Sequence, residues 1–234
     1  KRLPRYDDAE ESDTFMFSGA EDLVPFLKVA DEQPAPNPRG WTVEEKTVGG
    51  YSIRRYRPRI EGGFSRIEKI THSEQGVWWK VTTRDNVTTY FGKSPEYRIA
   101  DAGRIFQWLP ELSFDDKGNC VLYQFKAEDG HGYRETVFDA NRFDPDGKPR
   151  FTNRYLKRVF YCPLTPFSPF SQPGQTDTSA ALYCPNNPVS GDFLMELVLD
   201  YGEHGALPGT SQGNVTAAYA ETNAWITRHD AFSS

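Results

Sequence analysis

Short runs of alternating apolar and polar residues, each bounded by Gly, Asn or Asp, constrain this chain more than any other feature. In residues 77–84, VWWKVTTR, odd-numbered side chains share one face and even-numbered ones share the other. Residues 120–127, CVLYQFKA, alternate in the same way. A period of two is the period of a β-strand. The sequence therefore predicts an all-β fold of antiparallel strands joined by hairpins and long loops.

Turn residues between these runs predict where the hairpins reverse. Asp85-Asn86 lies between two alternating runs, and Asn tolerates the positive φ that tight hairpins require. Gly118 and Gly147 occupy equivalent positions in DDKGN and DPDGK, where a left-handed residue is usually needed. We expect hairpins at Asp85-Asn86 and near Gly118.

Other segments are less regular. Residues 193–202, FLMELVLDYG, are nearly all apolar at their start, which predicts a more fully buried strand. Residues 20–30 could form a short helical turn interrupted by Pro25. Residues 213–225 are the best helical candidate, although their Val and Thr content leaves the assignment open. Residues 31–40 and the Pro/Ser-rich residues 162–191 are predicted loops, and the second is long enough to be functional, packed over a surface, or mobile.

The composition suits one β-domain over residues 1–234. Hydrophobic residues make up 37% of the chain and aromatic residues 14%, which favours a core of few but large side chains. The low apolar fraction also fits a segment whose other face is covered by further polypeptide. Both ends of the sequence lie in the middle of a pattern, so we expect a fragment of a longer chain.

The charge pattern argues against a nucleic-acid partner. The net charge is −6, whereas phosphate contacts need a basic surface. The densest basic run places arginines on alternating sides of a predicted strand, close to acidic residues: Arg54, Arg55, Arg57 and Arg59. Ion-paired or solvated strand faces explain this run better than a phosphate site does.

The cysteines and the apolar runs limit the cellular setting. Three cysteines at irregular spacing (Cys120, Cys162 and Cys184) argue against a disulfide framework, although one Cys162–Cys184 pair stays open. No apolar run approaches the roughly 18 residues of a membrane span, and the first residues show no apolar region of a classical signal peptide. We expect no membrane insertion.

One short motif resembles a hydrolase nucleophile. GTSQG matches G-x-S-x-G at Ser211, and Glu221 and His229 follow in the order acid then histidine. However, His229 lies only 18 positions after Ser211 (229 − 211), and no strand directly precedes the motif. We interpret these residues as part of a loop, and we predict no Ser211–His229 pair.

Metal and sugar sites are weakly indicated. DPDG at residues 144–147 resembles the start of a calcium loop, but Asn153 stands where an EF-hand has Glu. The histidines are scattered and show no zinc spacing: His72, His131, His204 and His229. We expect no catalytic, cofactor-binding or metal-binding residue. A glycosidase pair of carboxylates stays open, because the distance between two carboxylates that defines such a pair is not given by the sequence. The tryptophans are predicted to belong to the core, with a sugar-stacking platform as the alternative: Trp41, Trp78, Trp79, Trp108 and Trp225.

Several phrases together resemble one known family. LPRYDD, SGAEDLVP, YRPRIEGGFSRIEKI, WKVTTRDNVTTYFG, RIFQWLPELSFDDKGN, YQFKAED, NRYLKRVFY and LVLDYGEHG occur in order over most of the chain. They resemble the SpvB-like region, which opens the B component of insecticidal Tc toxin complexes and forms the amino-terminal half of SpvB. Residues 162–191 show little of this likeness, and Ala231 stands where the family has Pro.

The resemblance implies a structural role. It implies a curved sheet in the wall of a hollow β-rich cocoon, one face covered and one facing a lumen, that encloses and helps deliver a toxic enzyme. The implied partners are the rest of the polypeptide, with its β-propeller and Rhs/YD-repeat shell, the Tc-toxin C component and the pore-forming A component. The toxic enzyme would lie in a separate domain or protein, and the complex would be secreted. The alternative is a carbohydrate- or cell-surface-binding β-module that uses exposed aromatic residues.

Overall fold

The structure is a computed structural model that describes residues 14–17, 21–29, 40–101, 103–128, 143, 146, 152–170, 181–199 and 201. Within these residues the regular structure is strand, apart from two single 3-10 turns, Pro95–Tyr97 and Ser190–Asp192. The expected all-β fold is confirmed. The strands are β1 (Met16–Phe17), β2 (Glu21–Pro25), β3 (Leu27–Val29), β4 (Trp41–Val43), β5 (Glu45–Val48), β6 (Tyr51–Pro58), β7 (Arg66–His72), β8 (Gly76–Thr82), β9 (Thr88–Phe91), β10 (Arg98–Asp101), β11 (Arg104–Trp108), β12 (Pro110–Phe114), β13 (Cys120–Ala127), β14 (Arg154–Pro163) and β15 (Phe193–Val198).

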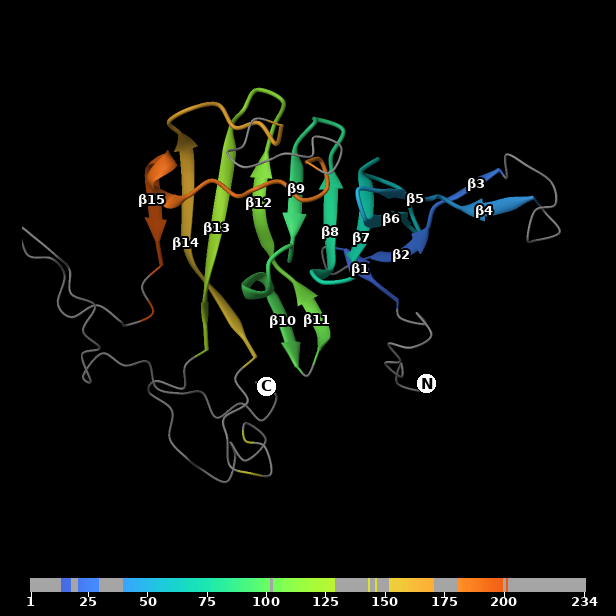
Figure 1. Cartoon of the computed structure of the whole chain (residues 1–234), viewed down its shortest axis with the longest axis horizontal. Helices are drawn as coiled ribbons and strands as arrows, with labels where there is room; N and C mark the ends of the chain where they lie inside the picture. The colour runs from blue at the N-terminus through green and yellow to red at the C-terminus, as the bar shows by residue number, and fades with distance from the viewer. Residues whose placement is uncertain are drawn as a thin grey trace, which may run out of the picture.

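One large antiparallel sheet dominates the described structure. Its strands follow the order β1-β2-β6-β7-β8-β9-β12-β13-β14-β15, and β5 also pairs with β6. Two small hairpins, β3–β4 and β10–β11, form separate two-stranded sheets. Figure 1 shows the sheet curving from β15 at one end to β6, with β3–β4 extending beyond the other end. Neighbouring strands are mostly consecutive in the sequence, so local hairpins build most of the sheet.

Both predicted hairpins are confirmed. Asn86 has a φ of 60° in the turn between β8 and β9, where the Thr83 N–H donates to the Val87 carbonyl at 2.9 Å. Gly118 has a φ of 87° in the turn between β12 and β13. A side chain at position 118 would lie 2.6 Å from the Pro166 Cβ, so this turn requires Gly for its backbone and for its close neighbour.

The short turn considered possible in residues 20–30 is not formed by the described part of this segment, which is strand. Glu21–Pro25 and Leu27–Val29 are strands, and residues 23–25 pair with β6. Pairing along β6 satisfies backbone groups that a helix interrupted by Pro25 would leave unbonded, and Pro25 occupies a strand end, where its missing N–H costs least. The other helical candidate, residues 213–225, lies outside the described residues.

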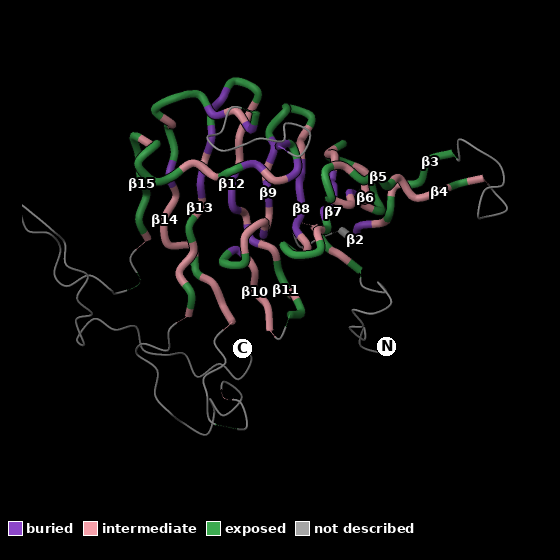
Figure 2. The backbone as a smooth tube through the Cα atoms, viewed as in Figure 1, coloured by how far each residue is buried: buried purple, intermediate pink, exposed green. Residues whose placement is uncertain are grey.

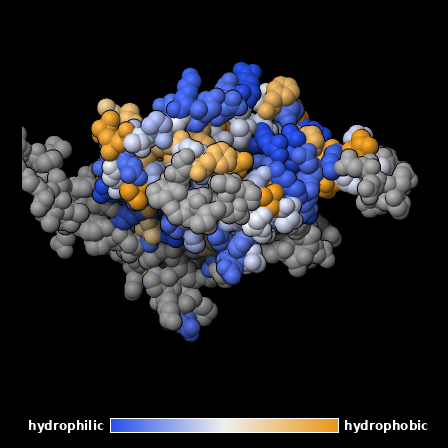
Figure 3. Space-filling view, turned by 45° about the horizontal axis from the view of Figure 1, so that its top comes forward, coloured by the Kyte–Doolittle hydropathy of each residue, from blue (hydrophilic) through white to orange (hydrophobic). Residues whose placement is uncertain are grey.

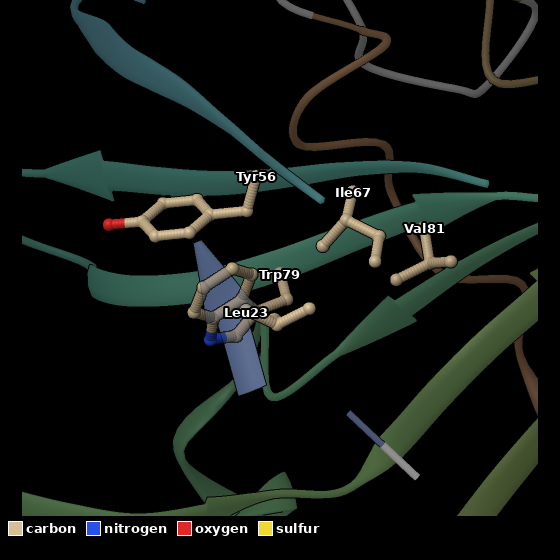
Figure 4. Packing of buried hydrophobic residues seen from close by; sticks show 5 residues of the cluster. All are labelled: Leu23, Tyr56, Ile67, Trp79 and Val81. Carbon is tan, nitrogen blue, oxygen red and sulfur yellow. The ribbon is translucent and has the colours of Figure 1, made fainter. Parts of the chain in front are cut away.

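The middle of the sheet is buried on both faces. The consecutive residues Trp78 and Trp79 are 0% and 6% exposed, although they point to opposite faces. Trp79 packs with Leu23, Tyr56, Ile67 and Val81, as Figure 4 shows. Trp78 belongs to a second cluster that contains Ile53, Ile70, Tyr90 and Tyr183. Figure 2 shows burial concentrated in the central strands. This differs from the expectation of one covered face, because the chain itself covers the second face.

The cover for that second face comes from the predicted loop of residues 162–191. Residues 181–189 cross the sheet, as Figure 1 shows. The Tyr183 carbonyl accepts from the Trp78 indole at 3.0 Å, and the Leu182 carbonyl accepts from the Tyr90 hydroxyl at 2.6 Å. Of the three outcomes considered for this loop, its described part is packed over a surface. Cys162 and Cys184 do not pair, and all three cysteines are free.

Candidate interaction surface

β15 is the edge strand of the large sheet, and it is apolar on both faces. Among the described residues it pairs only with β14. Leu194 and Val198 are 70% and 41% exposed, and Met195 and Leu197, which point to the other face, are 51% and 53% exposed. An exposed apolar edge strand offers unpaired backbone groups and apolar side chains to another strand. A further strand could therefore pair with the outer edge of β15 and extend the sheet.

The expectation of a fully buried strand in residues 193–202 is therefore wrong for its described part. A continuous apolar run indicates that both faces of a strand are meant to be covered, but it does not say which residues cover them. In β8 that cover comes from elsewhere in the described chain. In β15, Glu196 forms an ion pair with Arg158 of β14.

A second apolar surface lies at the opposite end, on the β3–β4 hairpin. Leu27 pairs with Val43, and Val29 pairs with Trp41, so these four side chains share one face. Leu27, Val29 and Trp41 are between 44% and 64% exposed. Figure 3 shows apolar side chains at both ends of the molecule. The alternation in Leu27-Lys28-Val29 and in Trp41-Thr42-Val43 is a sequence signal for strands, but it was not used to predict this hairpin.

The buried Glu111 carboxylate and the neighbouring Lys93 form bonds that hold the fold together. Glu111, which is 0% exposed, accepts from the Ser94 N–H and hydroxyl and from the Asn187 amide, all at 2.7 Å. Lys93 lies 3.7 Å from the same carboxylate and donates to the Asn187 side chain at 2.6 Å. These bonds join β12 and the turn after β9 to the segment that crosses the sheet. They leave the carboxylate well satisfied and enclosed.

A second buried charge pair lies beneath Tyr183. Glu68 contacts Lys80 at 3.5 Å and Arg66 at 2.9 Å. Lys80 Nζ lies 5.2 Å from the centre of the Tyr183 ring. Burial lowers the pKa of Lys80, and the Glu68 carboxylate opposes that shift. Because Lys80 is paired with Glu68 and covered by the Tyr183 ring, it is poorly placed to act on a substrate.

The basic run is mostly ion-paired, as predicted. Arg54 contacts Glu45 at 3.1 Å, Arg55 contacts Glu44 at 3.2 Å, and Arg59 contacts Asp22 at 3.3 Å. Arg57 makes no ion pair with any described residue. Asp22 lies in β2, Glu45 begins β5 and Glu44 directly precedes it, so the sheet topology brings these opposing charges together.

The residues considered for catalysis cannot be placed. Ser211, Glu221 and His229 lie outside the described residues, as do Asp144, Gly147, His131 and His204. The described part of the chain contains no cluster of His, Cys, Asp or Glu that could hold a metal ion. It also contains no helix that is long and apolar enough to cross a membrane.

The tryptophans that are described divide between core and surface. Trp78 and Trp79 are buried, and Trp108 packs against both clusters, with its indole donating to the Val77 carbonyl at 2.8 Å. Trp41 is 44% exposed. Trp225 lies outside the described residues.

His72 caps a turn, because its Nδ1 accepts from the Glu74 N–H at 3.3 Å.

Comparison with known proteins gives relatives over the whole chain. The mono(ADP-ribosyl)transferase SpvB of Salmonella typhimurium (strain 14028s / SGSC 2262) is 30% identical over 238 residues, which cover 99% of this chain and 35% of the relative. SpvB of Salmonella choleraesuis (strain SC-B67) matches with the same figures. The chain thus spans about a third of the length of the curated relatives it matches.

Two solved structures share the fold. The N-terminal domain of effector protein SpvB from Salmonella typhimurium strain LT2 has a TM-score of 0.65 and 26% identity, covering 95% of this chain and 63% of that one. The crystal structure of TcdB2-TccC3-Cdc42 has a TM-score of 0.63 and 27% identity, covering 90% of this chain and 9% of that one. The likeness is to a Tc-toxin-related N-terminal domain. A family model described as Salmonella virulence plasmid 65kDa B protein matches residues 1–234, and the chain therefore belongs to the SpvB family.

Proposed function

We propose that this chain is a non-catalytic wall segment of a bacterial toxin-delivery protein, forming one domain in a shell that encloses and helps deliver a toxic enzyme. Its immediate partner is then the rest of its own polypeptide. The C component and the pore-forming A component of a Tc-type complex would be contacted through other regions, and the complex would be secreted.

β15 is the observation that carries this proposal. The sheet has a well-buried middle and an apolar edge strand whose outer edge pairs with no described residue. A wall made of β-strands needs such an edge, because each segment continues into the next by backbone pairing. The match to 9% of the TcdB2-TccC3-Cdc42 chain supports the same interpretation, because there this fold is a small part of a much larger polypeptide.

The absence of catalysis is part of the proposal. The relatives are mono(ADP-ribosyl)transferases by name, but this chain matches only 35% of their length, and the likeness includes the SpvB N-terminal domain. Glu111 and the Glu68–Lys80 pair, which are buried in the described sheet, are held by hydrogen bonds or ion pairs. We expect no transfer of labelled ADP-ribose from NAD to protein acceptors by residues 1–234. Transfer by these residues would contradict the non-catalytic role.

The wall role is tested by comparing residues 1–234 with the longer polypeptide that contains them. We expect the isolated chain to self-associate in sedimentation experiments and to melt at a lower temperature, because the longer polypeptide adds contacts to the edge. The double variant Leu194→Lys and Leu197→Lys, which charges both faces of β15, should reduce self-association. The control Val189→Lys changes an equally exposed residue outside the strand and should not.

Two outcomes would contradict the wall role. One is an isolated chain that stays monomeric and melts at the temperature of the longer polypeptide. The other is a β15 double variant that assembles into the longer polypeptide without any loss of stability. Either result would describe a self-sufficient module and not a segment of a continuous wall.

The alternative is a carbohydrate-binding module, and the exposed Trp41 is the observation that favours it. Trp78 and Trp79 cannot form a sugar platform because they are buried on opposite faces. Binding on a glycan array that is lost in Trp41→Ala and kept in Phe106→Ala, another exposed aromatic, would support this function.

A further inference from the structure

A small pocket lies where β2 and β3 meet the end of β6 and the turn that follows it. Its volume is about 280 Å³. The residues that form its walls include three aromatic rings and three charged side chains: Phe26, Tyr56, Phe64, Arg55, Arg57 and Glu61. The pocket is separate from β15 and from the exposed face of β3–β4, and the wall role does not use it.

Phe64 is the first sign that the pocket has a use. Its φ is 50°, a left-handed conformation that disfavours a bulky residue, and Gly62 and Gly63 stand immediately before it. The side chain is 71% exposed, so little burial compensates for the strain. The Glu61 carboxylate accepts from the Phe64 N–H at 2.8 Å and holds the backbone in place. Strain without burial indicates that the ring is retained for contact with something else.

The arginines are the second sign. The Arg55 guanidinium lies 4.0 Å from the centre of the Phe26 ring, which fixes its plane. Its Nη1 donates to the Glu44 carboxylate, and its buried Nε has no hydrogen-bond partner among the described residues. Arg57 is exposed and makes no ion pair with a described residue, unlike the other three arginines of this run.

The pocket is lined by two guanidinium groups, Arg55 and Arg57, and by one carboxylate, Glu61, which accepts from the Phe64 N–H. Glu44 pairs with Arg55 at 3.2 Å and lies 4.0 Å from Arg66. Arg57 therefore remains available beside aromatic walls. A guanidinium in such a setting favours a carboxylate, which it can bind through two parallel N–H bonds.

We propose that this pocket binds an acidic peptide segment in which a carboxylate lies next to an aromatic side chain. Arg57 takes the carboxylate, and the ring inserts between Phe26 and Phe64. The volume is slightly below the roughly 300–1,000 Å³ of pockets for drug-sized ligands, which suits one side chain and its acidic neighbour and not an elongated cofactor. The carboxylate comes from an Asp or Glu side chain or from a chain terminus.

Fluorescence anisotropy with short labelled peptides tests this binding on residues 1–234. The first peptide carries an internal Asp-Phe pair and blocked ends, and the second replaces Asp with Asn. A third ends in Phe with a free carboxylate and has no acidic side chain, and a fourth is its amidated form. Saturable binding of the first or third peptide, at least about tenfold tighter than its neutral counterpart, is expected. The two acidic peptides distinguish the two sources of the carboxylate.

Two variants and one control complete the test. Arg57→Gln removes the free charge, and Phe64→Gly removes the ring and relieves the positive φ, so the second should keep or raise the melting temperature while it weakens binding. Arg84→Gln changes an exposed arginine whose contact with Asp85 is 3.9 Å, and it should bind as the unmodified chain does. Equal binding of the acidic and neutral peptides, no binding of either acidic peptide, or full binding by both variants would overturn the proposal.

Discussion

β8 and β15 are both rich in apolar residues, but only β8 is buried. In β8, Phe15 and Leu23 contact the cluster on one face, and Tyr183 contacts the cluster on the other. In β15, four apolar side chains on two faces are more than 40% exposed. Burial of a strand therefore depends on which other segments cross it, and not only on the strand's own side chains. Stability of the described sheet should therefore reside in its middle, while β15 is available for pairing.

The largest expected effect comes from a matched pair of leucines. Leu112 in β12 is 0% exposed, and Leu194 in β15 is 70% exposed. Leu112→Ala should lower the free energy of unfolding by about 2–5 kcal/mol, because it removes buried methyl groups and leaves a cavity. Leu194→Ala should change it by less than about 0.5 kcal/mol. Urea unfolding of both variants measures the contrast, and similar losses would show that β15 is as well packed as the centre.

The cysteines allow the same comparison without mutation. Cys120 is 2% exposed, and burial raises the pKa of its thiol from 9.0 to about 11. Two pKa units correspond to about 100-fold less thiolate at neutral pH, or about 2.7 kcal/mol. Cys162 is exposed at the end of β14. Mass spectrometry after brief treatment with a thiol reagent should find Cys162 modified well before Cys120. Equal rates would indicate that the central sheet opens as readily as its periphery.

Two glycines in hairpin turns test how much packing against a turn contributes to stability. Gly118 and Gly103 both have a φ near 85°, but only Gly118 has a close neighbour, Pro166. Gly103→Ala should cost about 1–2 kcal/mol for the left-handed backbone alone. Gly118→Ala should cost more, because the added Cβ also forces the chain of residues 166–167 away from the turn. Thermal unfolding compares the two variants. Equal losses of stability would show that packing against Pro166 contributes nothing at position 118.

The sequence predicted features that depend on nearby residues. Asn86 and Gly118 mark turns because a local positive φ demands those residue types. For the arginine run it predicted only ion-paired or solvated strand faces, and the partners of Arg54, Arg55 and Arg59 are set by strand pairing. The exposure of β15 could not be predicted, because it depends on which distant segment covers the strand. Phe64 was missed for a similar reason. The Gly62-Gly63 pair was not singled out in the sequence, and the approach of Phe26 and Arg57 is set by the pairing of β2 with β6.

The smallest expected effect concerns a turn on the surface of the sheet. Asp115 accepts from the Asn119 side chain at 2.7 Å and from the Lys117 and Asn119 N–H groups at 2.9 Å. The bond from the Asn119 side chain, followed by the backbone bonds, lowers the pKa of the Asp115 carboxyl from 3.8. A group whose pKa is depressed by folding stabilises the folded state when it is ionised in both states.

This stabilisation is present above the unfolded pKa near 3.8 and is lost as the pH falls through the lower folded value. Asp115→Asn removes the charge and keeps the shape of the side chain. We therefore expect the variant to melt slightly below the unmodified chain at pH 6, with the difference shrinking as the pH falls below 3.8. A melting-temperature difference that stays constant with pH would show that the hydrogen-bond geometry, and not the carboxylate charge, stabilises this turn. Because Asp115 lies in a surface turn and is only partly buried, even a confirmed effect would be small beside that of Leu112, so the local turn fixes the register of β12 and β13 while burial supplies most of the stability.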